Sequence, residues 1–177
     1  VGMAAAPVAR PAAAQVPADR AALEELGERL ADLADTIQLR RAWEAPTPDG
    51  AGPESAALGD LRHGFIALRL AELSSPRWYR RAEASFERAA RAEPGWPYPP
   101  YGKALAKYGI SEAQRADPLE IGTQVGVGAL DDAVSALAAA IALDPAFEPA
   151  LVALDRLAQR LNRPDYWRRA LAAVRQA

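Results

Sequence analysis

The sequence is short of the side chains that carry out catalysis. It contains one histidine, His63, and no cysteine among 177 residues. This excludes a disulfide scaffold, a zinc–cysteine site, an iron–sulfur cluster, a thiol nucleophile and a multi-histidine metal site. No acid or nucleophile lies near His63 in the sequence that could act with it in a reaction. We therefore expect His63 to pack between helices in a protein that is not an enzyme and needs no cofactor or metal.

Two other clusters resemble ligand sites only superficially. Asp131 and Asp132 are adjacent, and adjacent residues of a helix do not face each other, so we interpret them as the cap and first turn of a helix. Gly122, Gly126 and Gly128 invite comparison with a phosphate-binding loop. Neither a GK[ST] ending nor the dinucleotide fingerprint spacing is present. A surface loop is the better interpretation.

The basic residues are almost all arginine, although the net charge of the chain is close to zero. The net charge is -2, which argues against a general nucleic-acid-binding protein. Nineteen of the 21 basic residues are arginine. Together with 43 alanines, this favours the coding bias of a GC-rich bacterium, and the alternative is recognition of phosphate or carboxylate by arginine. The basic, partly aromatic segment that begins at Trp78 is expected to be a solvated helix face.

The N-terminal residues 1–17 are small residues and prolines with one charge. They resemble the end of a secretory signal or the spacer after one, so we expect a periplasmic or otherwise exported protein, with the cytoplasm as the alternative. No apolar run reaches the length needed to span a membrane, which leaves a membrane-protein partner open. Because such a segment cannot build a core, it is either a disordered tail or held by another protein.

Residues 18–44 predict the first helix, with Asp19 as its candidate N-cap. Apolar residues follow a narrow stripe at Leu23, Leu26, Leu30, Leu33 and Ile37. We expect this stripe to pack on a neighbouring helix of the same chain, and the alternative is a helix of a partner. Residues 45–54 form a linker by composition.

From residue 55 onward a pattern of small and large residues recurs. Three segments match at Ala82, Phe86 and Ala89, at Ala133, Leu137 and Ala140, and at Ala170, Val174 and Ala177. The segments before them match at Gly64, Ala67, Leu70 and Ala71, at Gly102, Leu105, Tyr108 and Gly109, and at Asp155, Ala158, Leu161 and Asn162. The lead-in Trp78-Tyr79-Arg80-Arg81 also recurs, as Tyr166-Trp167-Arg168-Arg169. The pattern predicts pairs of antiparallel helices.

Small residues at these positions let two helices approach closely, while the larger residue one turn on fills the adjacent groove. Gly109 and Asn162 favour the left-handed turn that ends a helix. Pro94 and Pro145 follow the second helix of a pair and prevent its continuation. Since each pair leaves an apolar face, the pairs must stack.

This pattern resembles the tetratricopeptide repeat family, whose helix–turn–helix unit carries small residues, aromatics and a terminal proline. The resemblance covers residues 57–177 and is strongest in DDAVSALAAAIALDPAFEPALVAL. It implies an all-α solenoid of about three repeats. Ala82 to Ala133 is 51 residues and Ala133 to Ala170 is 37, against a family period of 34, so residues are inserted near Leu73–Arg77 and after Gly109. We carry over no peptide-carboxylate clamp, because its basic residues cannot be placed.

Two segments of the 55–177 domain are candidate partner-binding sites. The inserted loop 110–130 carries the apolar residues Leu119, Ile121, Val125 and Val127. Long loops in compact domains are often functional. Trp96, Tyr98 and Tyr101 lie among prolines and could form a recognition surface. They can equally brace the turn between two repeats, which is the interpretation that we favour.

The sequence therefore predicts a non-catalytic helical-repeat scaffold, adaptor or accessory subunit of a larger, envelope-associated complex. Its protein partners are expected at the N-terminal tail and the 110–130 loop, with no nucleic acid involved. The alternative is the N-terminal repeat module of a longer protein whose activity lies elsewhere, because no polar capping helix follows the last predicted helix.

Overall fold

The computed structural model describes residues 28, 30, 35–45, 53–116 and 128–176. All the regular secondary structure in these ranges is α-helical, as the sequence predicts. The helices are α2 (Thr36–Glu44), α3 (Pro53–Leu73), α4 (Trp78–Ala92), α5 (Tyr98–Ala116), α7 (Ala129–Leu143), α8 (Glu148–Arg160) and α9 (Asp165–Gln176). None of these helices is both long and apolar enough to cross a membrane.

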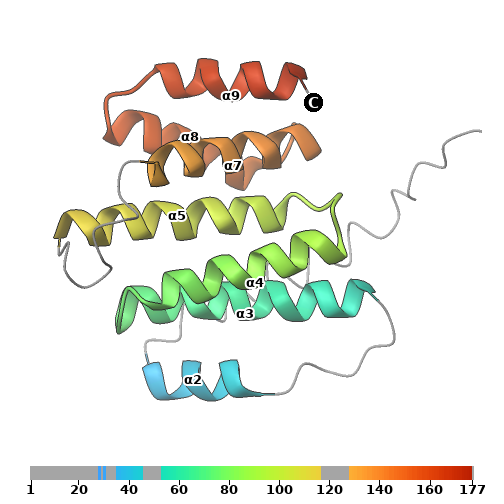
Figure 1. Cartoon of the computed structure of the whole chain (residues 1–177), viewed down its shortest axis with the longest axis vertical. Helices are drawn as coiled ribbons and strands as arrows, with labels where there is room; N and C mark the ends of the chain where they lie inside the picture. The colour runs from blue at the N-terminus through green and yellow to red at the C-terminus, as the bar shows by residue number, and fades with distance from the viewer. Residues whose placement is uncertain (1–27, 29, 31–34, 46–52, 117–127, 177) are drawn as a thin grey trace, which may run out of the picture.

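The helices lie across the long axis of the molecule, with α2 at one end of the stack and α9 at the other (Figure 1). Each helix from α3 onward packs on the helix that follows it, and α3 also contacts α5, as α7 contacts α9. Successive helices run in alternate directions (Figure 1). This is a helical-repeat-like arrangement, in which α2 covers the outer side of α3.

Small residues sit where the helices approach most closely. Phe86 of α4 is fully buried, and its ring lies against Gly64 of α3 and Gly102 of α5. A Cβ atom at Gly64 would come within 2.5 Å of that ring, which is far inside ordinary contact distance. Ala82 and Ala89 are also fully buried. The close-contact positions expected from the repeat are thus confirmed in the first helix pair.

The apolar residues form two clusters along the stack. The first cluster surrounds Phe86 and includes Leu39, Leu61, Ile66, Leu70 and Ala106. The second cluster includes Ala104, Leu137, Ile141, Phe147, Leu154 and Ala170. Helix α5 belongs to both clusters, and the half-buried Tyr98 at its start packs against each of them.

The two residues expected to end helices behave differently. Asn162 has a left-handed φ of 50°, and the following Arg163 N–H donates to the Ala158 carbonyl at 2.8 Å, so α8 ends as predicted. Gly109 does not end a helix, because α5 continues to Ala116. Its missing side chain instead makes room for the ring of Tyr79. The residue is glycine for packing, not for a turn.

The predicted first helix differs from the structure at Asp35. This residue is extended (φ -88°, ψ 111°), and its Oδ1 accepts the Ile37 N–H at 2.8 Å, so a separate helix, α2, begins there. Ile37, placed in the buried stripe by the sequence, is 61% exposed, whereas Leu39 is fully buried. Leu23, Leu26 and Leu33 lie outside the described residues, as does the tail 1–17.

The predicted linker and loop are shorter than their composition implies. Helix α3 already begins at Pro53, inside the range 45–54. Of the loop 110–130, residues 110–116 belong to α5, with Ile110 and Ser111 buried, and Ala129 begins α7. Residues 117–128 are left between them, and of these 117–127 lie outside the described residues.

Candidate functional site

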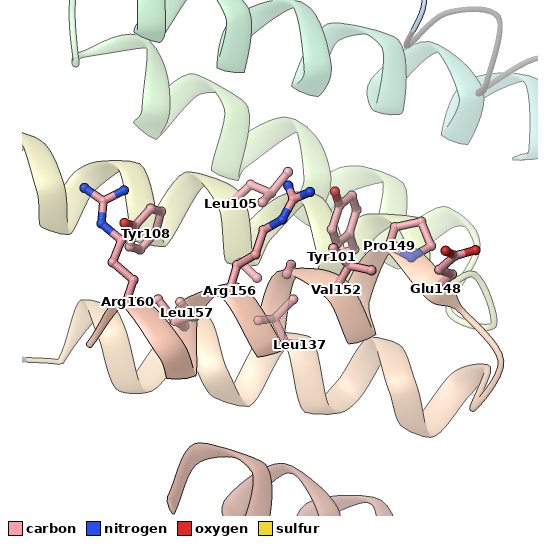
Figure 2. Close-up of a pocket in the computed structure, with 13 residues that line it drawn as sticks. Tyr101, Leu105, Tyr108, Leu137, Glu148, Pro149, Val152, Arg156, Leu157 and Arg160 are labelled. Carbon is pink, nitrogen blue, oxygen red and sulfur yellow. The ribbon is translucent and has the colours of Figure 1, made fainter. Parts of the chain in front are cut away.

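A groove of about 520 Å³ lies between α5 and α8, with α7 beneath it (Figure 2). Both α5 and α8 pack on α7, which holds them side by side. The α5 wall consists of Tyr101, Ala104, Leu105 and Tyr108. The α8 wall consists of Glu148, Pro149, Val152, Ala153, Arg156, Leu157 and Arg160, and Ala133 and Leu137 of α7 form the floor.

Helical periodicity explains why these residues gather. On α8, every fourth residue from Glu148 to Arg160 lies on one stripe, because residues four apart share a helix face. Val152, in the middle of the stripe, is 37% exposed. The stripe is therefore acidic at one end, apolar in the middle and basic at the other end. Arg156 and Arg160 point from α8 toward α5, and Glu148 lies at the opposite end (Figure 2).

The two arginines of the groove have different partners. The Arg160 guanidinium is 2.7 Å from the Glu112 carboxylate of α5 and lies 5.7 Å from the centre of the Tyr108 ring, so it links the two walls. Arg156 is exposed and makes no ion pair with any residue that the structure describes. It is therefore available to an acidic group that enters the groove.

The two tyrosines add polar atoms to an otherwise apolar wall. Burial raises the pKa of Tyr101, although the nearby Arg156 acts in the opposite direction. Burial and the Glu112 carboxylate likewise raise the pKa of Tyr108. Both hydroxyls are thus protonated at neutral pH and can donate a hydrogen bond. The Tyr108 hydroxyl lies near Glu112 but makes no well-formed hydrogen bond within the described residues, although it is buried.

The structure separates the aromatic residues that the sequence grouped. Tyr101 lines the groove and packs its ring edge-on to Phe147, with centroids 5.6 Å apart. Tyr98 packs on the same ring at 4.8 Å, and Trp96 packs against the first cluster. These contacts favour the bracing interpretation for Trp96 and Tyr98, and a partner contact for them stays a prediction. The loop candidates Leu119, Ile121, Val125 and Val127 lie outside the described residues.

Sequence reasoning missed most of the groove. Leu105 and Tyr108 were noted only as repeat positions, and Val152, Arg156 and Arg160 were not noted as a site. The i, i+4 stripe on α8 was a usable signal, because an apolar residue flanked by unlike charges on one face is not a core pattern. The partner wall could not be inferred, since α5 and α8 are separated in sequence by the insertion and α7.

The residues considered for chemistry lie elsewhere. His63 packs against Trp43 of α2, with ring centroids 5.0 Å apart, and burial lowers its pKa. Asp131 and Asp132 occupy the first turn of α7, as expected, although the N-cap is Gly128, and they bind Arg169 at 2.6 Å and Lys107 at 3.3 Å. Among the described residues, no three His, Asp or Glu side chains gather as a metal site would require.

The groove thus offers an apolar floor, the hydroxyl of Tyr101 and the guanidinium of Arg156, which has no ion pair within the described residues. These groups can bind an apolar segment and an acid beside it, and none of them is a nucleophile paired with a base. Comparisons of the chain with protein-family models, with curated proteins and with solved structures found no match.

Proposed function

We propose that this chain is a non-catalytic helical-repeat scaffold of the tetratricopeptide type, which binds a protein partner in the α5–α8 groove. The groove carries the proposal: it is open, mostly apolar and lined by two tyrosines and by Arg156, which makes no ion pair with a described residue. Aromatic residues and arginine are enriched at protein interfaces. The α-solenoid assignment is supported by the alternating helices and by the small residues at their contacts.

The chemistry of the walls defines the partner segment. Its apolar side chains would pack between Leu105 and Val152, and an aspartate, a glutamate or a terminal carboxylate would pair with Arg156. The groove follows α8, a helix of 13 residues, which is about 20 Å long at 1.5 Å per residue. That length accommodates a segment of six or seven extended residues.

The loop 117–127 and the tail 1–17 extend this proposal. The sequence places candidate partner contacts in both segments, and α5 and α7, the helices that flank the loop, also form the groove. A partner held in the groove would be within reach of the loop. We keep the loop apolar residues as proposed contacts on this basis.

The proposal is tested by selecting peptides from a random display library with the full chain. Enriched peptides should carry apolar residues next to an acid, and Val152→Glu should weaken their binding about tenfold or more. Leu171→Glu is the matched control, because Leu171 is also exposed, at 49%, but lies on α9 away from the groove. Peptides whose affinity is equal for both variants would contradict a groove-binding function.

A further inference from the structure

A second hollow, of about 450 Å³, lies at the other end of the stack from α9, where α2 meets the turn between α3 and α4. It is lined by Arg40, Trp43 and Glu44 of α2, by Ser75 and Arg77 of the turn, and by Trp78 and Arg81 of α4. Neither the groove nor the proposed partner binding involves these residues. Its volume is within the range of small-ligand sites.

The aromatic part of the hollow is held in place by ring packing. Trp43 meets Trp78 edge-to-face, with centroids 5.3 Å apart, and also contacts His63. The Arg81 guanidinium stacks on the Trp78 ring, 4.4 Å from its centre. Stacking leaves the N–H edge of a guanidinium free to bind an anion. The hollow therefore combines two indoles with an oriented cation.

The charges of the hollow are not balanced within the part of the chain that the structure describes. Arg40, Arg77 and Arg81 line the hollow together with one carboxylate, Glu44, so three positive charges against one negative leave about two. None of these four side chains makes an ion pair with any part of the chain that the structure describes. Several other cations of the first helix pair and of α5 have acidic partners, as Lys103 has Glu87 at 2.8 Å and Arg88 has Asp60 at 2.8 Å.

An internal comparison shows that the imbalance is specific to this repeat. Helices α4 and α9 begin with matching segments, and Arg77 occupies the position that Asp165 holds as the first residue of α9. There, Arg163 pairs with Asp165 at 2.8 Å, and Arg169, the counterpart of Arg81, pairs with Asp131 at 2.6 Å. Arg77 and Arg81 instead are like charges four residues apart, in and just before the first turn of a helix, where cations are unfavourable. A bound anion would remove this cost.

We propose that this hollow binds an aromatic phosphate monoester, with its phosphate between the three arginines and its ring against Trp43 and Trp78. A phosphate monoester carries about 1.5 to 2 negative charges at neutral pH, which matches the unbalanced charge better than one carboxylate does. Arginine forks bind phosphate oxygens in pairs. The indoles and the volume provide for a ring, which inorganic phosphate lacks.

The test is calorimetric titration of the full chain, at constant ionic strength, with phenyl phosphate and with adenosine monophosphate. These two probes stand for a phosphorylated tyrosine and a nucleotide. Saturable binding of either supports the proposal and identifies its source. We expect Arg77→Gln and Arg81→Gln to weaken that binding about tenfold or more, as loss of a charged hydrogen bond does. Arg168→Gln, the same change in the α9 segment, should leave it unchanged.

A charge-reversed variant keeps the test independent of folding. Arg77→Asp places an acid where α9 has Asp165, at the start of the helix, so it should abolish binding while raising the midpoint of thermal unfolding. No saturable binding of either probe overturns the proposal. So does an equal loss in Arg168→Gln, or inorganic phosphate that binds as tightly as phenyl phosphate, because the indoles would then contribute nothing.

Discussion

Gly102 of α5 lies so close to the ring of Phe86 on α4 that a Cβ atom there would overlap with the ring. Phe86 is fully buried and also meets Gly64 on its other side, so it has no space to move away. Gly102→Ala should therefore destabilise the fold by about 1–3 kcal/mol, in spite of the better helix propensity of alanine. Urea unfolding followed by circular dichroism measures this difference.

Gly95→Ala is the matched control for this prediction. Gly95 is in the turn before α5, and a Cβ atom there would meet nothing within 4 Å. Its change in unfolding free energy should stay within about 0.5 kcal/mol. Combining Gly102→Ala with Phe86→Leu should recover part of the loss, because the two changes share one contact. Equal effects of the two glycine variants would show that the ring contact does not limit stability.

Asn162 should tolerate glycine better than alanine. Its φ of 50° is left-handed, which costs about 1–2 kcal/mol for a residue with a Cβ and no side-chain hydrogen bond, but little for glycine. Asn162→Ala is therefore expected to lower the free energy of unfolding by about 1 kcal/mol, and Asn162→Gly to leave it the same or raise it. Thermal unfolding of the pair checks this, and a glycine variant no more stable than the alanine variant would contradict it.

The Lys107 ammonium links three helices. It is 2.9 Å from Glu83 of α4 and 3.3 Å from Asp132 of α7, and its side chain is only 16% exposed. Partial burial strengthens these ion pairs, and removal of the ammonium leaves both carboxylates without a partner. Lys107→Met should therefore lower the free energy of unfolding by about 1–2 kcal/mol. Lys103→Met is the control: Lys103 has the single partner Glu87 and is 36% exposed, so its loss should cost about 0.5 kcal/mol or less. Urea unfolding at low salt compares them.

His63 should make the stability depend on pH. Burial lowers its pKa below 6.5, with Asp60 acting in the opposite direction. The unfolded chain therefore binds more protons than the folded one between the lowered pKa and 6.5, and stability falls as the pH falls through that window. His63→Gln should show a smaller loss there than the unaltered chain. Because His63 is the only histidine, an untagged protein gives a single imidazole NMR titration, and a midpoint at or above 6.5 would contradict this explanation.

The sequence predicted those parts of the fold that depend on neighbours within a helix pair. Small residues at Ala82, Ala89 and Gly102 predict close approach because a helix surface is periodic. The prediction for Gly109 was wrong because glycine favours both left-handed turns and close contacts between helices. The sequence alone does not show that the ring of Tyr79 packs against this residue. The interruption at Asp35 was missed because the apolar stripe continues across it, whereas Asp35 itself starts a helix by binding a backbone N–H.

The candidate site was less accessible to such reasoning. Tyr101 was selected for the prolines around it, not for a groove. Arg156 is significant only because α7 places it opposite α5 without an acidic partner. Such a relationship depends on where the residues between α5 and α7 bring the next helix, and local spacing contains no information about it.

Helix α5 contributes alternate faces to two cores, with Ala106 in one and Ala104 in the other. We therefore expect a division of cooperativity, in which α7 to α9 lose their packing while α3 and α4 keep theirs around Phe86. The groove belongs to the second of these units, because its floor and one wall come from α7 and α8. A partner bound there would slow amide hydrogen exchange mainly in α7 to α9, and a ligand at Arg77 would slow it mainly in α2 to α4. Amide hydrogen exchange of a single chain would then distinguish a partner in the groove from a ligand in the hollow.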